Sequence, residues 1–166
     1  MNLTKAQLLQ VDHFHLDDDL ILQADDIKNL PEVISLKKVH VIADGNLDEQ
    51  GEKCFVHLDV KGDMILHDAI TNEPIHFDLI SASDEIYSFV ASDEDDVRIV
   101  ENEIDLKIAI LDMIQLAVPI QVTKAKEDEY PEGEGWKVYS EAAYQQSRKD
   151  EVDPRLAKLK ELKEQD

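Results

Sequence analysis

The chain has 166 residues, a length that suits one folded domain with a substantial core and leaves little room for two. Apolar residues make up 43% of it and aromatic residues only 5%, which predicts a core of Val, Ile and Leu. Its net charge is −21, from 17 basic and 38 acidic residues. So acidic a body argues against a general nucleic-acid binder, because such proteins concentrate Lys and Arg against the phosphates.

The sequence also bears on the compartment. No apolar run is long enough to span a bilayer, and the N-terminus lacks the basic-then-apolar layout of a secretory signal. The single cysteine, Cys54, cannot form an internal disulfide, which fits a reducing environment. These features predict a cytoplasmic protein.

The acidic charge is unevenly distributed. Residues 148–166 hold six basic and six acidic side chains, so residues 1–147 carry 11 basic and 32 acidic ones and with them the whole net charge. A field of this sign favours a basic protein as partner over a polyanion. The alternative is that the charge serves solubility alone.

In chain order, residues 1–10 predict a short helix or an extended lead-in, and 11–16 a strand. The clearest strands follow as β-branched runs at 39–42, 54–60, 64–66, 75–80 and 85–90. Turn-forming residues at 44–46, 49–51, 61–63 and 71–74 separate them. This spacing predicts an antiparallel meander.

A helix is predicted next over residues 106–116. Asp105 is a suitable N-cap and Pro119 ends the helix. Because Ile108, Ile110, Leu111 and Ile114 make it apolar on most sides, we expect it to lie against the sheet. The predicted fold class is therefore α+β, an antiparallel sheet covered by one apolar helix.

The C-terminal part is predicted to be more loosely attached. We assign residues 1–123 to the α+β body, 124–148 to a mobile linker and 149–166 to a polar helical tail. In the tail, Asp153 and Pro154 form a helix start signal. A narrow stripe of leucines with a basic side chain beside it follows: Arg155, Leu156, Leu159 and Leu162. Such a helix can dock on its own domain or in the groove of a partner, and we favour the partner.

Polar side chains gather on one side of the predicted strands. Alternation places His57 with Asp59, and His76 with Asp78, on the side opposite the apolar residues, and His13 and His15 project together. His and carboxylate groups in this pattern suit a divalent metal, so a metal-dependent hydrolase is an alternative function. The simpler interpretation, which we prefer, is a solvated sheet face.

Two other functions are considered, a cysteine nucleophile and direct RNA binding. Cys54 falls on the apolar side of its strand, where burial is expected rather than nucleophilic use. A direct RNA-binding module is a further alternative, and it needs the sparse cations Lys37, Lys38, Lys53 and Lys61 to cluster at one sheet edge.

Several segments together resemble the YceD family of large ribosomal RNA subunit accumulation proteins. The similarity covers about residues 35–165, and Asp-Pro-Arg-Leu at 153–156 is its most specific element. The other matching segments are Gly-Asp-Met-Ile-Leu at 62–66, Glu-Asn-Glu-Ile-Asp-Leu at 101–106, Val-Pro at 118–119 and Gly-Trp at 135–136.

The resemblance implies a non-enzymatic role in the accumulation of large-subunit ribosomal RNA, with no catalytic residues and no cofactor. Many relatives carry a Cys-x-x-Cys pair where this chain has Asp-Ala-Ile-Thr at 68–71, and often a cysteine cluster where residues 122–136 contain none. We therefore expect no structural zinc in this protein.

Overall fold

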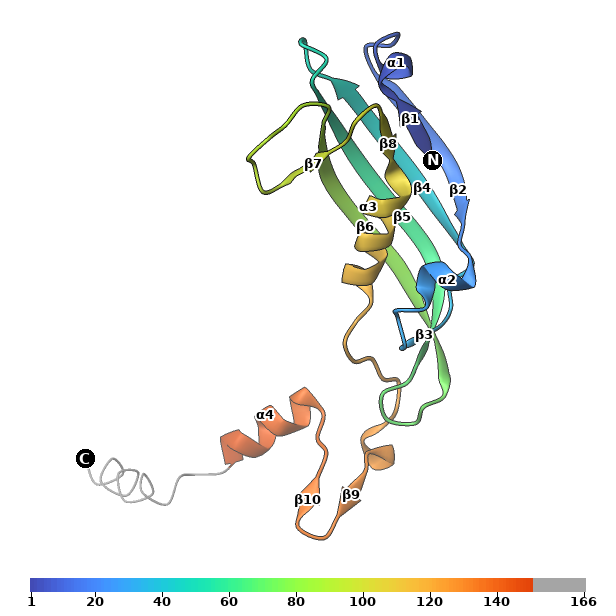
Figure 1. Cartoon of the computed structure of the whole chain (residues 1–166). Coiled ribbons are helices and arrows are strands. Elements are labelled where there is room, and N and C mark those ends of the chain that lie inside the picture. The colour runs from blue at the N-terminus through green and yellow to red at the C-terminus, as the bar shows by residue number, and fades with distance from the viewer. Residues whose placement is uncertain (151–166) are drawn as a thin grey trace, which may run out of the picture. The chain divides into compact units, whose positions relative to one another are not determined.

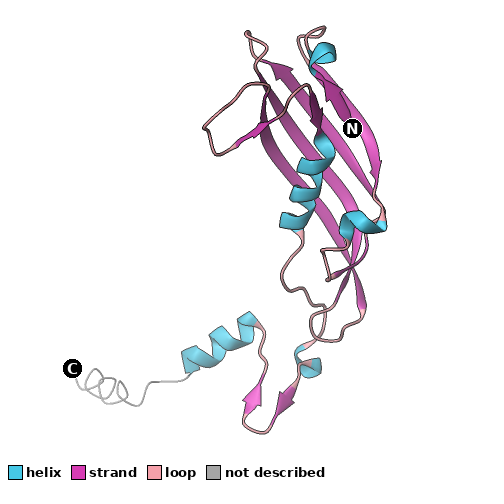
Figure 2. Cartoon of the chain, viewed as in Figure 1, coloured by secondary structure: helices cyan, strands magenta, loops and turns pink. Residues whose placement is uncertain are grey.

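A computed structural model describes residues 1–150, and within them the side chains of residues 1–147. The chain divides into two compact units, Met1–Val122 and Thr123–Asp166, and each is described by itself. The model has mixed α and β content, and its sheets are mostly antiparallel (Figures 1 and 2). The predicted α+β class is thus confirmed, whereas the division into body, linker and tail stays a prediction.

One twisted sheet dominates the first unit. Its strand order is β2-β4-β5-β6-β7, and β3 pairs with β5. All neighbours are antiparallel except β6 and β7, which run parallel. The strands are β2 (Phe14–Ile21), β3 (Val33–Ser35), β4 (Lys38–Leu47), β5 (Lys53–His67), β6 (Pro74–Ser88) and β7 (Val97–Ile99).

The strands are longer than the sequence predicts. Residues 61–63 were expected to form a turn, but β5 continues through them and pairs with β6 in an unbroken register from Lys53↔Ser88 to His67↔Pro74. The runs at 75–80 and 85–90, expected as two strands, form β6 up to Ser88. β2 also differs, since it covers Phe14–Ile21 instead of residues 11–16.

The turn predicted at 44–46 is also wrong, and Gly45 shows why. It lies inside β4, opposite Phe14 of β2 and Val56 of β5. A Cβ on Gly45 would stand 2.7 Å from the Phe14 ring and 2.5 Å from the Phe55 carbonyl oxygen. The glycine therefore permits a close approach within the sheet and does not form a turn.

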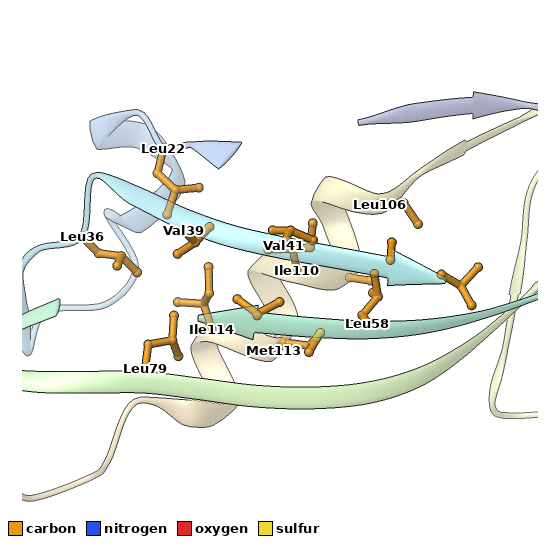
Figure 3. Close-up of a cluster of buried hydrophobic side chains, with 14 of the residues drawn as sticks. Leu22, Leu36, Val39, Val41, Leu58, Leu79, Leu106, Ile110, Met113 and Ile114 are labelled. Atoms are coloured by element: carbon orange, nitrogen blue, oxygen red, sulfur yellow. The ribbon is translucent and has the colours of Figure 1, made fainter. Parts of the chain in front are cut away.

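A twelve-residue helix, α3 (Leu106–Ala117), covers one side of the sheet. It begins where the sequence predicts, and the Asp105 carboxylate accepts a hydrogen bond from the Lys107 backbone N–H at 3.0 Å. α3 packs mainly against β6 and also against β5. Its buried residues join the inward side chains of the strands in one core (Figure 3), among them Val41, Leu58, Leu79, Leu106, Ile110, Met113 and Ile114.

Ion pairs fasten α3 at two further points. Arg98 of β7 donates to Glu85 of β6 at 2.7 Å and to Asp112 of α3 at 2.8 Å. Lys107 lies 2.8 Å from Asp26, which belongs to the short helix α2 (Ala24–Ile27). These ion pairs connect α3 to β6 and β7 at the sheet edge and to the short helix α2.

The N-terminal segment closes one end of the unit. β1 (Asn2–Thr4) pairs antiparallel with β8 (Glu103–Asp105), directly before α3. The helix α1 (Lys5–Leu8) follows, and Thr4 and Gln7 form its capping box. Leu8 is buried in the core.

The β5–β6 hairpin turn lies where relatives were expected to carry cysteines. Asp68 is almost fully buried, and its carboxylate accepts hydrogen bonds from the backbone N–H groups of Ile70 (2.8 Å) and Thr71 (3.0 Å). The Ala69 N–H donates to the Val122 carbonyl at 2.9 Å, which ties the hairpin to the chain after α3. An aspartate thus organises this turn through hydrogen bonds.

The described part of the second unit consists of small elements. A 3₁₀ turn, η1 (Glu127–Glu129), precedes a two-residue hairpin of β9 (Glu132–Gly133) and β10 (Trp136–Lys137), and α4 (Glu141–Asp150) follows. Across residues 1–150, no helix has the length and apolar character needed to cross a membrane.

Candidate functional site

The side of the sheet turned away from α3, here called the outer face, carries many charged and polar side chains. Alternate residues of β2, β4, β5 and β6 supply it, since their neighbours point into the core. It carries seven aspartates, Asp17, Asp19, Asp44, Asp59, Asp63, Asp78 and Asp84, and five histidines, His15, His40, His57, His67 and His76. Its lysines are Lys38, Lys53 and Lys61.

Strand register sets histidines opposite aspartates. His15 of β2 stands opposite Asp44 of β4, and its Nδ1 lies 2.7 Å from Asp44 Oδ1. His57 of β5 stands opposite Asp84 of β6, and its Nδ1 lies 2.6 Å from Asp84 Oδ1. These directly opposite pairs join β2 to β4 and β5 to β6 on the solvent side of the sheet.

Other pairs extend the same pattern. The ring of His40 lies between two carboxylates of β2, 3.4 Å from Asp17 and 3.3 Å from Asp19. His76 Nδ1 is 3.1 Å from Asp63 Oδ1. The result is a set of His–Asp pairs distributed over four strands rather than one compact centre.

These pairs shift ionisation in both directions. The hydrogen bond to Asp84 is the main cause that raises the pKa of His57 above its usual value. The pKa of Asp44 is lowered, chiefly by the hydrogen bond from His15 and also by one from His13, whose Nε2 is 3.2 Å away. The raised pKa of His57 favours its imidazolium form, and the lowered pKa of Asp44 favours its carboxylate form.

A shallow hollow of about 420 Å³ lies at one end of the outer face. Phe55 and Ile86 give it apolar character, and Phe55 is 42% exposed. Carboxylates surround these residues, from Asp44, Asp84 and Asp96. An aromatic ring framed by carboxylates suits the aliphatic stem and cationic head of a Lys or Arg side chain.

The predicted hydrolase constellation does not converge. His57 and His76 both lie on the outer face as expected, but His76 is opposite Ile65, eight residues along β5 from His57. At the rise of a strand, that is roughly 27 Å. No group of three or more His, Cys, Asp or Glu side chains suitable for a metal occurs in the described part of the chain. His13 and His15 do come together, on Asp44.

The predicted cationic cluster of Lys37, Lys38, Lys53 and Lys61 does not form as a whole. Lys53 and Lys61 lie eight residues apart on β5. Lys38 is 2.7 Å from Asp19 and Lys53 is 2.7 Å from Glu94. Lys61 is opposite His40, two residues from Lys38, so these two lysines are neighbours on the outer face. Lys38 and Lys53 are paired with carboxylates, however, and Lys53 lies apart, which does not favour a phosphate-binding patch.

Cys54 is buried, as its position in the strand predicts. Burial raises the pKa of its thiol to about 11. A thiol in this environment stays protonated at neutral pH and is a poor nucleophile.

The tail residues predicted to bind a partner lie outside the described residues: Asp153, Pro154, Arg155, Leu156, Leu159 and Leu162. The roles of Asp44 and Asp84 were not predicted from the sequence. Asp44 meets His15 and Asp84 meets His57 through cross-strand pairing, which the alternation within a single strand does not reveal.

The fold and this surface define a small, acidic α+β protein with a paired His–Asp sheet face. Comparison with known proteins gives its family: residues 56–163 match the model described as large ribosomal RNA subunit accumulation protein YceD. The chain is also 31% identical over 130 residues to an uncharacterized protein of Bacillus subtilis (strain 168), YlbN, covering 74% of this chain and 73% of that protein. This chain belongs to the YceD family. No solved structure matches it significantly.

Proposed function

We propose that this protein supports the accumulation of large-subunit ribosomal RNA without catalysis, by binding a basic protein partner in the cytoplasm. The family description supplies the process. The main support for a basic partner is the outer face. Its seven aspartates are spread over a broad sheet surface that no other described element of the first unit covers.

Electrostatics favours a protein partner over RNA. Ribosomal RNA is a polyanion, and a chain of net charge −21 repels it unless cations are grouped. Lys38 and Lys53 are instead engaged with carboxylates. A basic protein that must be kept soluble and free of premature RNA contacts offers the complementary charge.

The absence of catalysis is part of the proposal. It is supported by the burial of Cys54 and by the distance between His57 and His76 along β5. His40, His57 and His76 pair with different aspartates, so these three histidines do not share one reaction centre.

The tail is proposed as a second contact with the partner, on its sequence alone. Leu156, Leu159 and Leu162 offer an apolar stripe, and Arg155 can pair bidentately with an acidic group beside it. Deleting residues 150–166 should then leave the melting temperature nearly unchanged and abolish ribosomal RNA support in cells.

The outer face is tested by replacing its carboxylates in cells that lack the native protein. The test variant combines Asp17→Asn and Asp59→Asn, whose carboxylates lie 3.4 Å from His40 and 3.7 Å from His57 and form no ion pair with a lysine or arginine among the described residues. The matched control combines Asp12→Asn and Asp93→Asn, which are exposed, lie off the sheet and remove the same charge.

The ratio of large- to small-subunit ribosomal RNA is the readout, together with tagged recovery of basic proteins at physiological salt. We expect the outer-face variant to lower both and the control to leave both unchanged. Equal behaviour of the two variants would show that only total charge matters. Normal ribosomal RNA in cells without the protein would refute the proposed function itself.

A further inference from the structure

The sheet leaves one long edge without a partner strand. β6 is paired with β5 along its whole length, from Pro74 to Ser88. On its other side, β7 pairs only with Ile86, Tyr87 and Ser88. Within the first unit, residues 78–84 of β6 therefore have no strand on the side away from β5.

The hydrogen bonds around β6 identify the backbone groups that this edge presents. The Phe89 N–H donates to the carbonyl of Glu52, the residue before β5. The Ser88 carbonyl accepts from the N–H of Val100, the residue after β7. Because an antiparallel ladder alternates, odd residues of β6 bond to β5 and even residues point their N–H and C=O outward. Asp78, Ile80, Ala82 and Asp84 thus offer a row of backbone donors and acceptors.

The same four residues place their side chains on the outer face. Asp78, Ala82 and Asp84 are exposed, and Ile80 is 72% exposed. The edge thus has a carboxylate at each end and two apolar side chains between them. It spans roughly 20 Å at the rise of an antiparallel strand.

We propose that residues 78–84 of β6 bind an extended, basic segment of the partner as an added strand. Backbone hydrogen bonds to Ile80 and Ala82 would hold the segment. Basic side chains six residues apart would pair with Asp78 and Asp84, with small apolar residues between them over Ile80. This inference rests on the proposed function and names the conformation and charge pattern of the partner.

A second copy of this chain is a poor occupant. Antiparallel pairing of two β6 edges about Ser81, the middle of the free stretch, sets Asp78 opposite Asp84 twice. Like charges directly opposite each other destabilise a strand pair. Each copy also carries a net charge of −21. A basic segment removes both penalties, which decides the choice of occupant.

The key variant is Ala82→Pro. The Ala82 N–H points outward, so proline removes a donor from the free edge without removing a bond to β5. Ala82→Ser is the matched control, because it keeps the N–H at the same exposed position. Asp78→Lys is a second test variant, since Asp78 stands opposite Asp63 of β5 and a lysine in its place repels a basic segment.

The probe is a synthetic peptide with lysines at its two ends and alternating Thr and Val between them, added to the full-length labelled protein. We expect the amides of Ile80 and Ala82 to exchange at least about tenfold more slowly with peptide bound, a stabilisation of roughly 1.4 kcal/mol. Ala82→Pro and Asp78→Lys should each weaken binding at least about tenfold, and Ala82→Ser should not.

Other outcomes would overturn the edge proposal. Peptide-induced shifts at Asp17 and Asp59 without slower exchange at Ile80 would mean that the outer face binds and the edge does not, which leaves the proposed function intact. A dimer that Ala82→Pro dissociates in sedimentation would identify a second copy as occupant. Normal ribosomal RNA in cells carrying Ala82→Pro would refute the edge, whereas normal ribosomal RNA without the protein refutes the proposed function.

Discussion

Shortening Ile110 to alanine should destabilise the first unit strongly. Ile110 is fully buried on α3 and lies where the helix meets the sheet (Figure 3). Removing its side chain beyond Cβ loses the transfer free energy of buried methyl groups and leaves a cavity. Because Val41 and Leu58 across the interface are also fully buried and belong to the continuous strands β4 and β5, the site can collapse little. We expect a cost of about 3–4 kcal/mol, in the upper part of the usual range.

Ile108 provides the matched control on the same helix. It is 55% exposed, so Ile108→Ala makes the same chemical change and alters helix propensity equally, with little loss of burial. Urea unfolding followed by circular dichroism should give an almost unchanged midpoint for Ile108→Ala and a much lower one for Ile110→Ala, with similar m values. Similar losses in the two variants would refute the assignment of the buried side of α3.

Three further predictions concern single side chains. Asp84→Asn should lower the pKa of His57 towards its usual value in an NMR titration. Because this pKa is raised in the folded state, the His57–Asp84 pair contributes stability below about pH 6.5, and that stability is lost as the pH rises through the pKa of His57 in the folded protein. Tyr87→Phe should leave thermal stability equal or slightly higher, because the buried Tyr87 hydroxyl has no hydrogen-bond partner among the described residues. Asp105→Ala should cost about 1 kcal/mol in urea unfolding by removing the N-cap of α3.

Local signals predicted the elements that carry strong chemistry of their own. The start of α3 follows from Asp105, whose side chain caps the helix, and from the apolar run behind it. The side of Cys54 follows from alternation along β5. The turns predicted at 44–46 and 61–63 were wrong because glycine occurs both in turns and inside strands where chains approach closely. Gly45 and Gly62 both lie within strands, where an added Cβ would approach neighbouring atoms to 3.0 Å or less.

The candidate site could be predicted only in part. Alternation alone places His57 and Asp59 on the polar side, and the structure agrees. Which aspartate each histidine meets depends on register between strands far apart in sequence. Asp44 and His15, for example, are 29 residues apart and meet only because β2 pairs with β4 beyond the loop that holds α2. No pattern within one strand contains that information.

The two sides of the sheet divide stability from interaction. Val39, Val41 and Ala43 of β4 are fully buried beneath α3, whereas His40 and Asp44, alternating with them, remain partly exposed on the outer face. Since the apolar side holds the fold together, charge on the other side is free to vary without loss of the core. The outer face keeps carboxylates beside His15, His40, His57 and His76, so its negative field is reduced at those pairs but not abolished. In the proposed function, a surface of this kind attracts a basic chain over a broad area, and in the proposed edge contact the unpaired backbone of β6 fixes the place of that chain along one edge.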